Sequence, residues 1–120
     1  MKQVHVGIAE LIISQDPEES LVAANLGSCI GVAAYDRAQR IGGLVHCLLP
    51  LSKADPEKAV ERPAMYVDTG VSLLLESLLA RGADRKSLVI VVAGGANIND
   101  EQNVFEIGKR NYTVVRKLLW

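Results

Sequence analysis

Cys29 and His46 are the two side chains of this sequence whose types suit nucleophilic chemistry together. A thiol becomes a strong nucleophile when a neighbouring base takes its proton, and an imidazole is well suited to do so. Cys29 follows Leu26-Gly27-Ser28 at the start of an apolar run, and His46 lies within the next apolar run. The pair predicts cysteine-dependent catalysis. The alternative is a small buried thiol beside a hydrogen-bonded core histidine.

The two apolar runs, residues 29–36 and 41–49, predict a β-hairpin. Only the short polar stretch at residues 37–40 separates them, which is a length typical of a hairpin turn. Both runs are almost continuously apolar, so we expect this part of the sheet to be covered on both faces.

The register of this hairpin decides which side chains meet. With the turn centred midway through residues 37–40, Gly31 faces His46 across the hairpin. Because side chains alternate along a strand, Cys29 and His46 then share one face as diagonal neighbours, with Cα atoms about 7–8 Å apart. Cys47 points to the opposite face. A slip of one residue would exchange the roles of His46 and Cys47.

The residues around the cysteine suggest how it is activated. Gly27 and Ser28 are predicted to help bind the substrate, since backbone N–H groups of such a loop can point at a reacting carbonyl. Beside an imidazolium, the pKa of the Cys29 thiol is expected to fall below its ordinary value of about 8.5. The pKa of Cys47 is expected to rise, because burial between apolar neighbours disfavours the thiolate.

The composition is typical of a folded domain and not of a nucleic-acid-binding protein. The chain has 120 residues, of which 49% are hydrophobic, enough for a core and too many for a disordered protein. Its formal net charge is −1, and aromatic residues make up 4%. Nucleic acid is not an expected partner, because such proteins carry a basic excess and often stacking aromatics.

The sequence also argues against membrane insertion and metal binding. No apolar run approaches the ~18 residues that span a bilayer, and the first residues lack the apolar stretch of a secretory signal. We therefore expect a cytoplasmic protein with reduced cysteines. His5, His46 and the two cysteines show none of the paired spacings of zinc ligands, so we expect neither a metal nor a cofactor.

The rest of the chain predicts an α/β fold in a single domain over residues 1–120. Alternating apolar and polar residues predict a strand over residues 2–13, with His5 on its polar face. Pro63 and Gly82 are typical of the start and end of a helix, and apolar spacing from Ile107 predicts another. Further expected segments are a short strand at 21–24, a charged loop at 51–62, a buried strand at 87–92 and a tight glycine loop at 93–97.

Seven segments in order along the chain carry a family resemblance. They are Leu26-Gly27-Ser28-Cys29-Ile30-Gly31-Val32, Tyr35-Asp36, Gly42-Gly43-Leu44-Val45-His46, Leu48-Leu49-Pro50, Tyr66-Val67-Asp68-Thr69, Ala93-Gly94-Gly95-Ala96 and Ile107-Gly108-Lys109-Arg110-Asn111. Together they resemble CheD, the chemoreceptor glutamine deamidase family of bacterial and archaeal chemotaxis. The spacing from the cysteine to the histidine also fits this family.

The resemblance implies a fold, a reaction and partners. The fold would be a compact three-layer α/β/α sandwich around a largely antiparallel or mixed sheet. Cys29 would be the nucleophile and His46 its base, in an enzyme that converts specific glutamines of methyl-accepting chemotaxis receptors to glutamate. Asp68 and Thr69 would line the substrate groove, although capping of a helix N-terminus explains them nearly as well. The partners would be the helical cytoplasmic region of the receptors and a CheC-type phosphatase.

The sequence departs from the family pattern at three places. Ala23 stands where the family commonly has a Thr that helps orient the histidine, although a backbone carbonyl could still orient His46. Asn25 replaces the usual Gly. Family members also usually continue for several tens of residues after the last helix, whereas this chain ends at Trp120.

These departures lead to two further expectations. The alternative function is a CheD-like interaction module that binds receptors or a CheC-type phosphatase with weak or no catalysis. Without the usual C-terminal extension, a sheet edge or an apolar patch should be exposed, so we expect the chain to self-associate or to be marginally stable.

Overall fold

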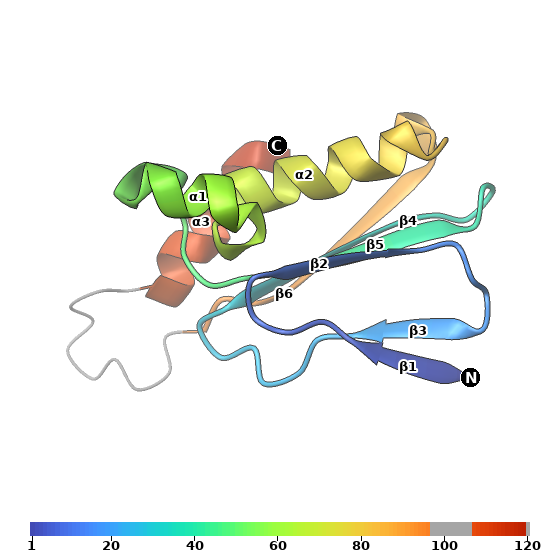
Figure 1. Ribbon diagram of the computed structural model, residues 1–120, viewed down its shortest axis with the longest axis horizontal. Helices are drawn as coiled ribbons and strands as arrows, with labels where there is room; N and C mark the ends of the chain where they lie inside the picture. The colour runs from blue at the N-terminus through green and yellow to red at the C-terminus, as the bar shows by residue number, and fades with distance from the viewer. Residues whose placement is uncertain (97–106, 120) are drawn as a thin grey trace.

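The computed structural model describes residues 1–96 and 107–119 and arranges them in layers (Figure 1). The middle layer is a four-stranded sheet. Helices α1 (Pro56–Glu61), α2 (Val67–Ala80) and α3 (Ile107–Leu119) lie on one side of it, and a two-stranded sheet lies on the other. The α/β class is confirmed. In the described residues, the small sheet occupies the side where the resemblance implied further helices.

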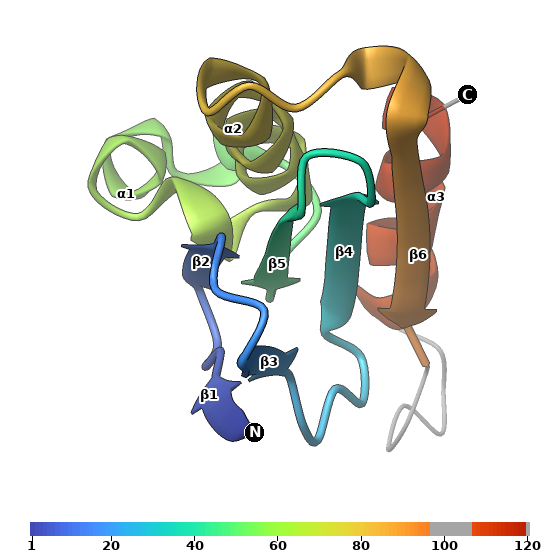
Figure 2. The same ribbon diagram turned by 90° about the vertical axis from the view of Figure 1, so that its right-hand side faces the viewer.

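The four-stranded sheet contains the predicted hairpin in the predicted register. Its strand order is β2-β5-β4-β6, and every neighbouring pair is antiparallel (Figure 2). Gly31 pairs with His46, and Ile30 pairs with Cys47. The register prediction is confirmed. The four strands are β2 (Glu10–Ser14), β5 (Ile41–Cys47), β4 (Ile30–Asp36) and β6 (Leu88–Gly94).

Asp36 closes the turn end of the hairpin. Its Oδ1 accepts hydrogen bonds from the N–H groups of Ala38 at 3.0 Å and Gln39 at 3.2 Å, and its Oδ2 accepts one from the N–H of Asp84 at 2.7 Å. The Asp84 N–H contributes most to lowering the pKa of Asp36, and burial of the carboxylate opposes it. The donors therefore keep a fully buried carboxylate charged.

The core lies between the four-stranded sheet and the helices. Apolar residues of β4 and β5 pack against one face of α2, and Val115 of α3 joins the same cluster. The helix predicted between Pro63 and Gly82 is confirmed as α2, preceded by a 3-10 turn at Pro63–Met65. Core aliphatic residues that are 1% exposed or less include Ile30, Val32, Val45, Val67, Val71, Leu74, Leu78 and Val115.

The single strand predicted over residues 2–13 is wrong. The chain forms β1 (Lys2–His5) and then turns before it enters β2. Ala9 in this turn has a φ of 63°, a left-handed conformation that interrupts a strand. β1 instead pairs in parallel with β3 (Glu19–Val22) to form the two-stranded sheet. The apolar alternation carried no signal of the left-handed residue.

Residues 51–62 contain a short helix where a charged loop was predicted. Asp55 caps α1, because its carboxylate accepts a hydrogen bond from the N–H of Lys58 at 3.1 Å. Pro56 occupies the first helical position, where its missing N–H has no helical partner to lose. The Asp-Pro pair was therefore a usable helix signal.

The remaining predicted elements are present with shifted ends. The strand predicted at 21–24 is β3, the strand at 87–92 is β6, and the helix from Ile107 is α3. Asn97, the last residue of the predicted glycine loop, and Trp120 lie outside the described residues.

In the described residues, β6 is an edge strand with an exposed apolar side. Val89 and Val91 are 59% and 60% exposed, on the side of the strand away from the helices. An unpaired edge offers N–H and C=O groups to another chain. The predicted self-association stays a prediction.

Candidate active site

Cys29 lies in a tight turn, residues 26–29, immediately before β4. The N–H of Cys29 donates to the carbonyl of Leu26 at 2.7 Å and closes this cysteine turn. Gly27 and Asn25 hold left-handed conformations, with φ of 50° and 56°. Glycine adopts such angles freely, and asparagine tolerates them better than most other residues. Asn25 can therefore occupy a position where the family commonly has glycine.

The end of β6 anchors the cysteine turn through backbone hydrogen bonds. The N–H of Gly95 donates to the carbonyl of Cys29 at 2.9 Å, and the N–H of Ala96 donates to the carbonyl of Gly27 at 3.0 Å. A Cβ on Gly94 would collide with the Cys29 carbonyl oxygen, so the close approach requires glycine. The glycine loop after β6 thus holds the candidate nucleophile in place.

Asn111 of α3 binds the cysteine turn from the helix layer. Its Nδ2 donates to the carbonyl of Ser28 at 2.9 Å and to the carbonyl of Leu48 at 3.0 Å. The side chain is fully buried, and its Oδ1 has no hydrogen-bond partner in the described residues. The predicted buried face of α3 consisted of apolar residues, so the sequence pattern missed this asparagine. The buried residues of α3 are Gly108, Asn111 and Val115.

His46 lies on the face of β5 that points away from the helices, and it is 2% exposed. Its Nδ1 lies 3.1 Å from the carbonyl oxygen of Val6. A carbonyl oxygen can only accept, so Nδ1 carries the proton and Nε2 of the neutral ring carries a lone pair. Nε2 is buried and has no hydrogen-bond partner in the described residues. This is the tautomer that a general base at Nε2 requires.

The turn between β1 and β2 holds His46 by both its ring and its backbone. Besides the bond that the ring donates to the Val6 carbonyl, the N–H of Ala9 donates to the His46 carbonyl at 2.8 Å. Val6 is itself fixed, because its N–H donates to the carbonyl of Val22 at 2.8 Å. The Val6 carbonyl therefore supplies the bond to the ring that the side chain of Ala23 cannot make.

Cys29 and His46 are not joined by a hydrogen bond within the described residues. β4 begins at Ile30, so Cys29 lies just outside the strand, where side-chain alternation no longer fixes its direction. Leu26 fills the space over Gly31, where an added Cβ would lie 3.4 Å from the Leu26 side chain. The shared face of Cys29 and His46 stays a prediction.

The two cysteines differ in their surroundings. Burial raises the pKa of the Cys29 thiol, and its own backbone N–H partly offsets the rise. The predicted lowering is therefore wrong, because burial outweighs the stabilisation of the thiolate. Burial also raises the pKa of Cys47 to about 12, with further contributions from Cys29 and Asp68. Cys47 is fully buried against Gly70 of α2, so its predicted rise is confirmed.

Asp68 and Thr69 hold the segment that precedes α2. Asp68 accepts hydrogen bonds from the N–H of Ser52 at 3.0 Å and from its hydroxyl at 2.7 Å. The Thr69 hydroxyl donates to the carbonyl of Pro63 at 2.6 Å. These hydrogen bonds give both side chains a structural role. That Asp68 and Thr69 line a substrate groove stays a prediction.

Gly27 and Ser28 present their backbone N–H groups at the corner of the cysteine turn. Their carbonyls are bonded to Ala96 and Asn111. Within residues 1–96 and 107–119, the N–H groups of Gly27 and Ser28 make no hydrogen bond. Together with the N–H of Leu26, they are backbone donors of the turn that have no partner in the described residues. The substrate-binding role of Gly27 and Ser28 stays a prediction.

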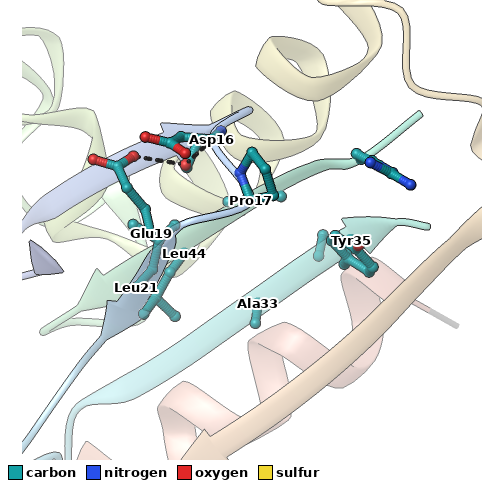
Figure 3. Close-up of a pocket in the computed structure, with 12 residues that line it drawn as sticks. Asp16, Pro17, Glu19, Leu21, Ala33, Tyr35 and Leu44 are labelled. Carbon is teal, nitrogen blue, oxygen red and sulfur yellow. Dashed lines mark hydrogen bonds between the residues drawn. The ribbon is translucent and has the colours of Figure 1, made fainter. Parts of the chain in front are cut away.

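A groove of about 380 Å³ opens beside β3 (Figure 3). Leu44 lines it and lies on the same face of β5 as His46, because side chains alternate along a strand. The groove runs between β3 and the β4–β5 hairpin, and neither Cys29 nor His46 lines it. The sequence pattern did not predict it, because it depends on β3 lying over the sheet. Its lining includes Asp16, Glu19, Leu21, Tyr35 and Leu44.

Among residues 1–96 and 107–119, no three histidine, cysteine, aspartate or glutamate side chains gather closely enough to hold a metal ion. No helix in these ranges is long and apolar enough to cross a bilayer.

The chain is similar to a known family and to several named proteins. Residues 48–120 match the family model for CheD chemotactic sensory transduction. The chain is 47% identical over 120 residues to the probable chemoreceptor glutamine deamidase CheD of Solibacter usitatus (strain Ellin6076), with 100% of this chain and 71% of that protein covered. It is 43% identical over 120 residues to the probable chemoreceptor glutamine deamidase CheD 1 of Syntrophus aciditrophicus (strain SB), covering 100% of this chain and 75% of that one.

Proposed function

This chain belongs to the CheD family, and we propose that it is a cysteine-dependent hydrolase that deamidates specific glutamines of methyl-accepting chemotaxis receptors to glutamate. Cys29 is the proposed nucleophile, and His46 is its proposed base. The proposed substrate is the helical cytoplasmic region of the receptors, which places the reaction in the cytoplasm. The names of the relatives support the deamidation.

The first half of the reaction forms a thioester. Nε2 of His46 takes the proton of the Cys29 thiol while Sγ attacks the carbonyl carbon of the glutamine carboxamide. The carbonyl oxygen becomes an oxyanion. Protonated His46 then gives its proton to the amide nitrogen, the C–N bond breaks, and ammonia leaves.

The second half hydrolyses the thioester. Nε2 of His46 takes a proton from water, and the resulting hydroxide attacks the thioester carbon. The C–S bond breaks, the Cys29 sulfur recovers a proton from His46, and a glutamate side chain remains. Each turnover consumes one water and releases one ammonia.

The oxyanion needs donors that are not otherwise bonded. The N–H of Cys29 is engaged with Leu26, so we assign this role to the N–H groups of Gly27 and Ser28. A donor of this kind typically contributes about 3–4 kcal/mol to stabilising the transition state. Each of these donors shares a planar peptide unit with a bonded carbonyl: the Gly27 N–H with the Leu26 carbonyl, and the Ser28 N–H with the Gly27 carbonyl. The bonds to those two carbonyls would keep the donors oriented.

The observation that carries the proposal is the hydrogen bond between Nδ1 of His46 and the Val6 carbonyl. It leaves the lone pair on Nε2, an atom that is buried without a partner in the described residues. Buried polar atoms are nearly always bonded, so an exception suggests a role in chemistry. The raised pKa of Cys29 fits the same scheme, because a protonated thiol needs a base at the moment of attack.

Ammonia release from a receptor cytoplasmic fragment tests the proposal. Wild-type protein should release ammonia, and peptide mass spectrometry should show a gain of about one dalton at each converted glutamine, because –NH2 becomes –OH. A fragment with glutamate already at those positions is the matched control and should release none. Unchanged peptide masses with a folded enzyme would overturn the proposal.

The second candidate function is an interaction module with weak or no catalysis. One observation favours it: no hydrogen bond joins Cys29 to His46 in the described residues. Such a module would bind the receptor fragment or a CheC-type phosphatase. Retained binding without ammonia release would support this function and exclude the first.

A further inference from the structure

We infer that Asn111 is a positioning residue of the candidate active site: its amide fixes the peptide unit between Ser28 and Cys29 and so sets the reactivity of the Cys29 thiol. The consequence for deamidation rests on the proposed function. The consequence for the thiol can be measured by itself.

The amide of Asn111 has one arrangement that fits its surroundings. Both of its nearest partners, the carbonyl oxygens of Ser28 and Leu48, are acceptors, at 2.9 and 3.0 Å. Nδ2 has two N–H groups, one for each oxygen. The flipped amide would place Oδ1 against both carbonyl oxygens, which is repulsive. The partners therefore determine the orientation of the side chain.

The bond to Ser28 acts on the cysteine through a single peptide unit. The Ser28 carbonyl and the Cys29 N–H belong to the same planar group. That N–H donates to Leu26 at 2.7 Å and also lowers the pKa of the Cys29 thiol. A hydrogen bond to a peptide carbonyl strengthens its N–H as a donor. Asn111 therefore both orients and polarises the N–H that stabilises the thiolate.

The bond to Leu48 ties the same amide to the strand of His46. Leu48 follows the end of β5, and its own N–H donates to the Met65 carbonyl at 2.8 Å. The Asn111 amide thus joins the cysteine turn to the end of β5. Loss of both donors would free the two segments to move relative to each other.

The unpartnered Oδ1 indicates that Asn111 is not there for packing alone. It is fully buried and has no hydrogen-bond partner in the described residues, which is unfavourable. A leucine of similar size would fill the position without an unpaired polar atom. The amide is therefore useful for its two N–H donors.

Alkylation of Cys29 by iodoacetamide, measured against pH by peptide mass spectrometry, tests the inference. Asn111→Leu removes both donors at similar side-chain size. Val115→Ala is the matched control, because Val115 is 1% exposed on the same buried face of α3 and makes no hydrogen bond to the turn. Asn111→Leu should shift the alkylation profile to higher pH and slow the reaction about threefold to tenfold at neutral pH. Val115→Ala should lower thermal stability without this shift.

A second variant covers the case in which Asn111→Leu does not fold. Asn111→Ala removes both donors without adding a charge or a larger side chain, so it should shift the profile in the same direction. A wild-type profile in folded Asn111→Leu or Asn111→Ala would overturn the inference. An equal shift in Val115→Ala would also overturn it. If the wild-type protein deamidates the receptor fragment, the Asn111 variants should have a lower kcat with KM unchanged. If the wild-type protein does not deamidate it, the alkylation profiles still test whether Asn111 sets the reactivity of Cys29.

Discussion

Buried polar groups differ in their hydrogen bonding between the two ends of the β4–β5 hairpin. At the turn end, the fully buried carboxylate of Asp36 accepts three backbone hydrogen bonds. At the open end, His46 and Asn111 are 2% and 0% exposed, and each keeps one polar atom without a partner. Nε2 of His46 and Oδ1 of Asn111 are the two buried side-chain atoms of this kind in the described residues.

From this difference we infer that the turn end of the hairpin serves stability and the open end serves chemistry. A satisfied buried carboxylate stabilises the fold, and an unsatisfied buried atom lowers stability unless it serves another purpose. Local rules of folding are typically broken at functional sites. Substitutions at the open end should therefore reduce activity, and substitutions at the turn end should reduce stability.

The largest expected effect comes from removing the base. His46→Ala should lower the rate of receptor deamidation by about 10²- to 10⁴-fold, because a positioned general base contributes that much. The measurement is ammonia release at saturating receptor fragment. His5→Ala is the control, since His5 is exposed in β1 and should leave the rate unchanged. Full activity in folded His46→Ala would contradict the assignment of activity to the open end of the hairpin.

A second large effect separates the two cysteines at the open end. Burial raises the pKa of Cys47 to about 12, so its thiol is protonated at pH 7, and the side chain is fully buried. Iodoacetamide should therefore label Cys29 well before Cys47, and His46→Ala should slow the labelling of Cys29. Peptide mapping that finds Cys47 labelled as fast as Cys29 would contradict the assignment of Cys29, and not Cys47, as the reactive cysteine.

A smaller effect concerns the packing of Cys47. A Cβ on Gly70 would lie 2.9 Å from the Cys47 sulfur and 3.3 Å from the Cα of Ala64. Gly70→Ala should thus lower the free energy of unfolding by about 1–3 kcal/mol through overpacking. Urea denaturation measures this change, with Ser72→Ala, at an exposed position of the same helix, as control. The double variant Gly70→Ala/Cys47→Ala should recover part of the loss, and no recovery would exclude this contact as its cause.

The smallest effect appears only in acid and concerns the turn end. The lowered pKa of Asp36 means that its stabilisation is present above the unfolded-state pKa of about 3.9 and is lost as pH falls through the folded-state value. Asp36→Asn should therefore be less stable than wild type at pH 7, and the difference should narrow below about pH 4. Thermal melts across pH measure it. A difference that does not depend on pH would contradict the lowered pKa.

The hairpin could be predicted from the sequence because its information is local. The polar residues 37–40 fix the turn, and the apolar runs on both sides fix the pairing of Gly31 with His46. The same register correctly placed Cys47 in the core. Strand alternation could not fix the direction of Cys29, because Cys29 lies before the strand begins.

The groups that surround His46 and Cys29 could not be predicted, because they come from distant segments. The Val6 carbonyl is 40 residues from His46 in the sequence, and Asn111 is 83 residues from Ser28. Helical periodicity treats an asparagine as a surface residue, so it assigned the buried face of α3 to apolar side chains alone. Every residue has a backbone carbonyl, so the sequence does not indicate which of them will face His46.

The central claim is that Cys29, assisted by His46, attacks the receptor glutamine, whereas Cys47 is a core residue. Parallel deamidation of a receptor cytoplasmic fragment by wild type, Cys29→Ala and Cys47→Ala tests it most directly, with conversion followed by peptide mass. Wild type and Cys47→Ala should both add about one dalton at each target glutamine, and Cys29→Ala should add none, because only Cys29 forms the thioester. Undiminished conversion by Cys29→Ala would contradict the account.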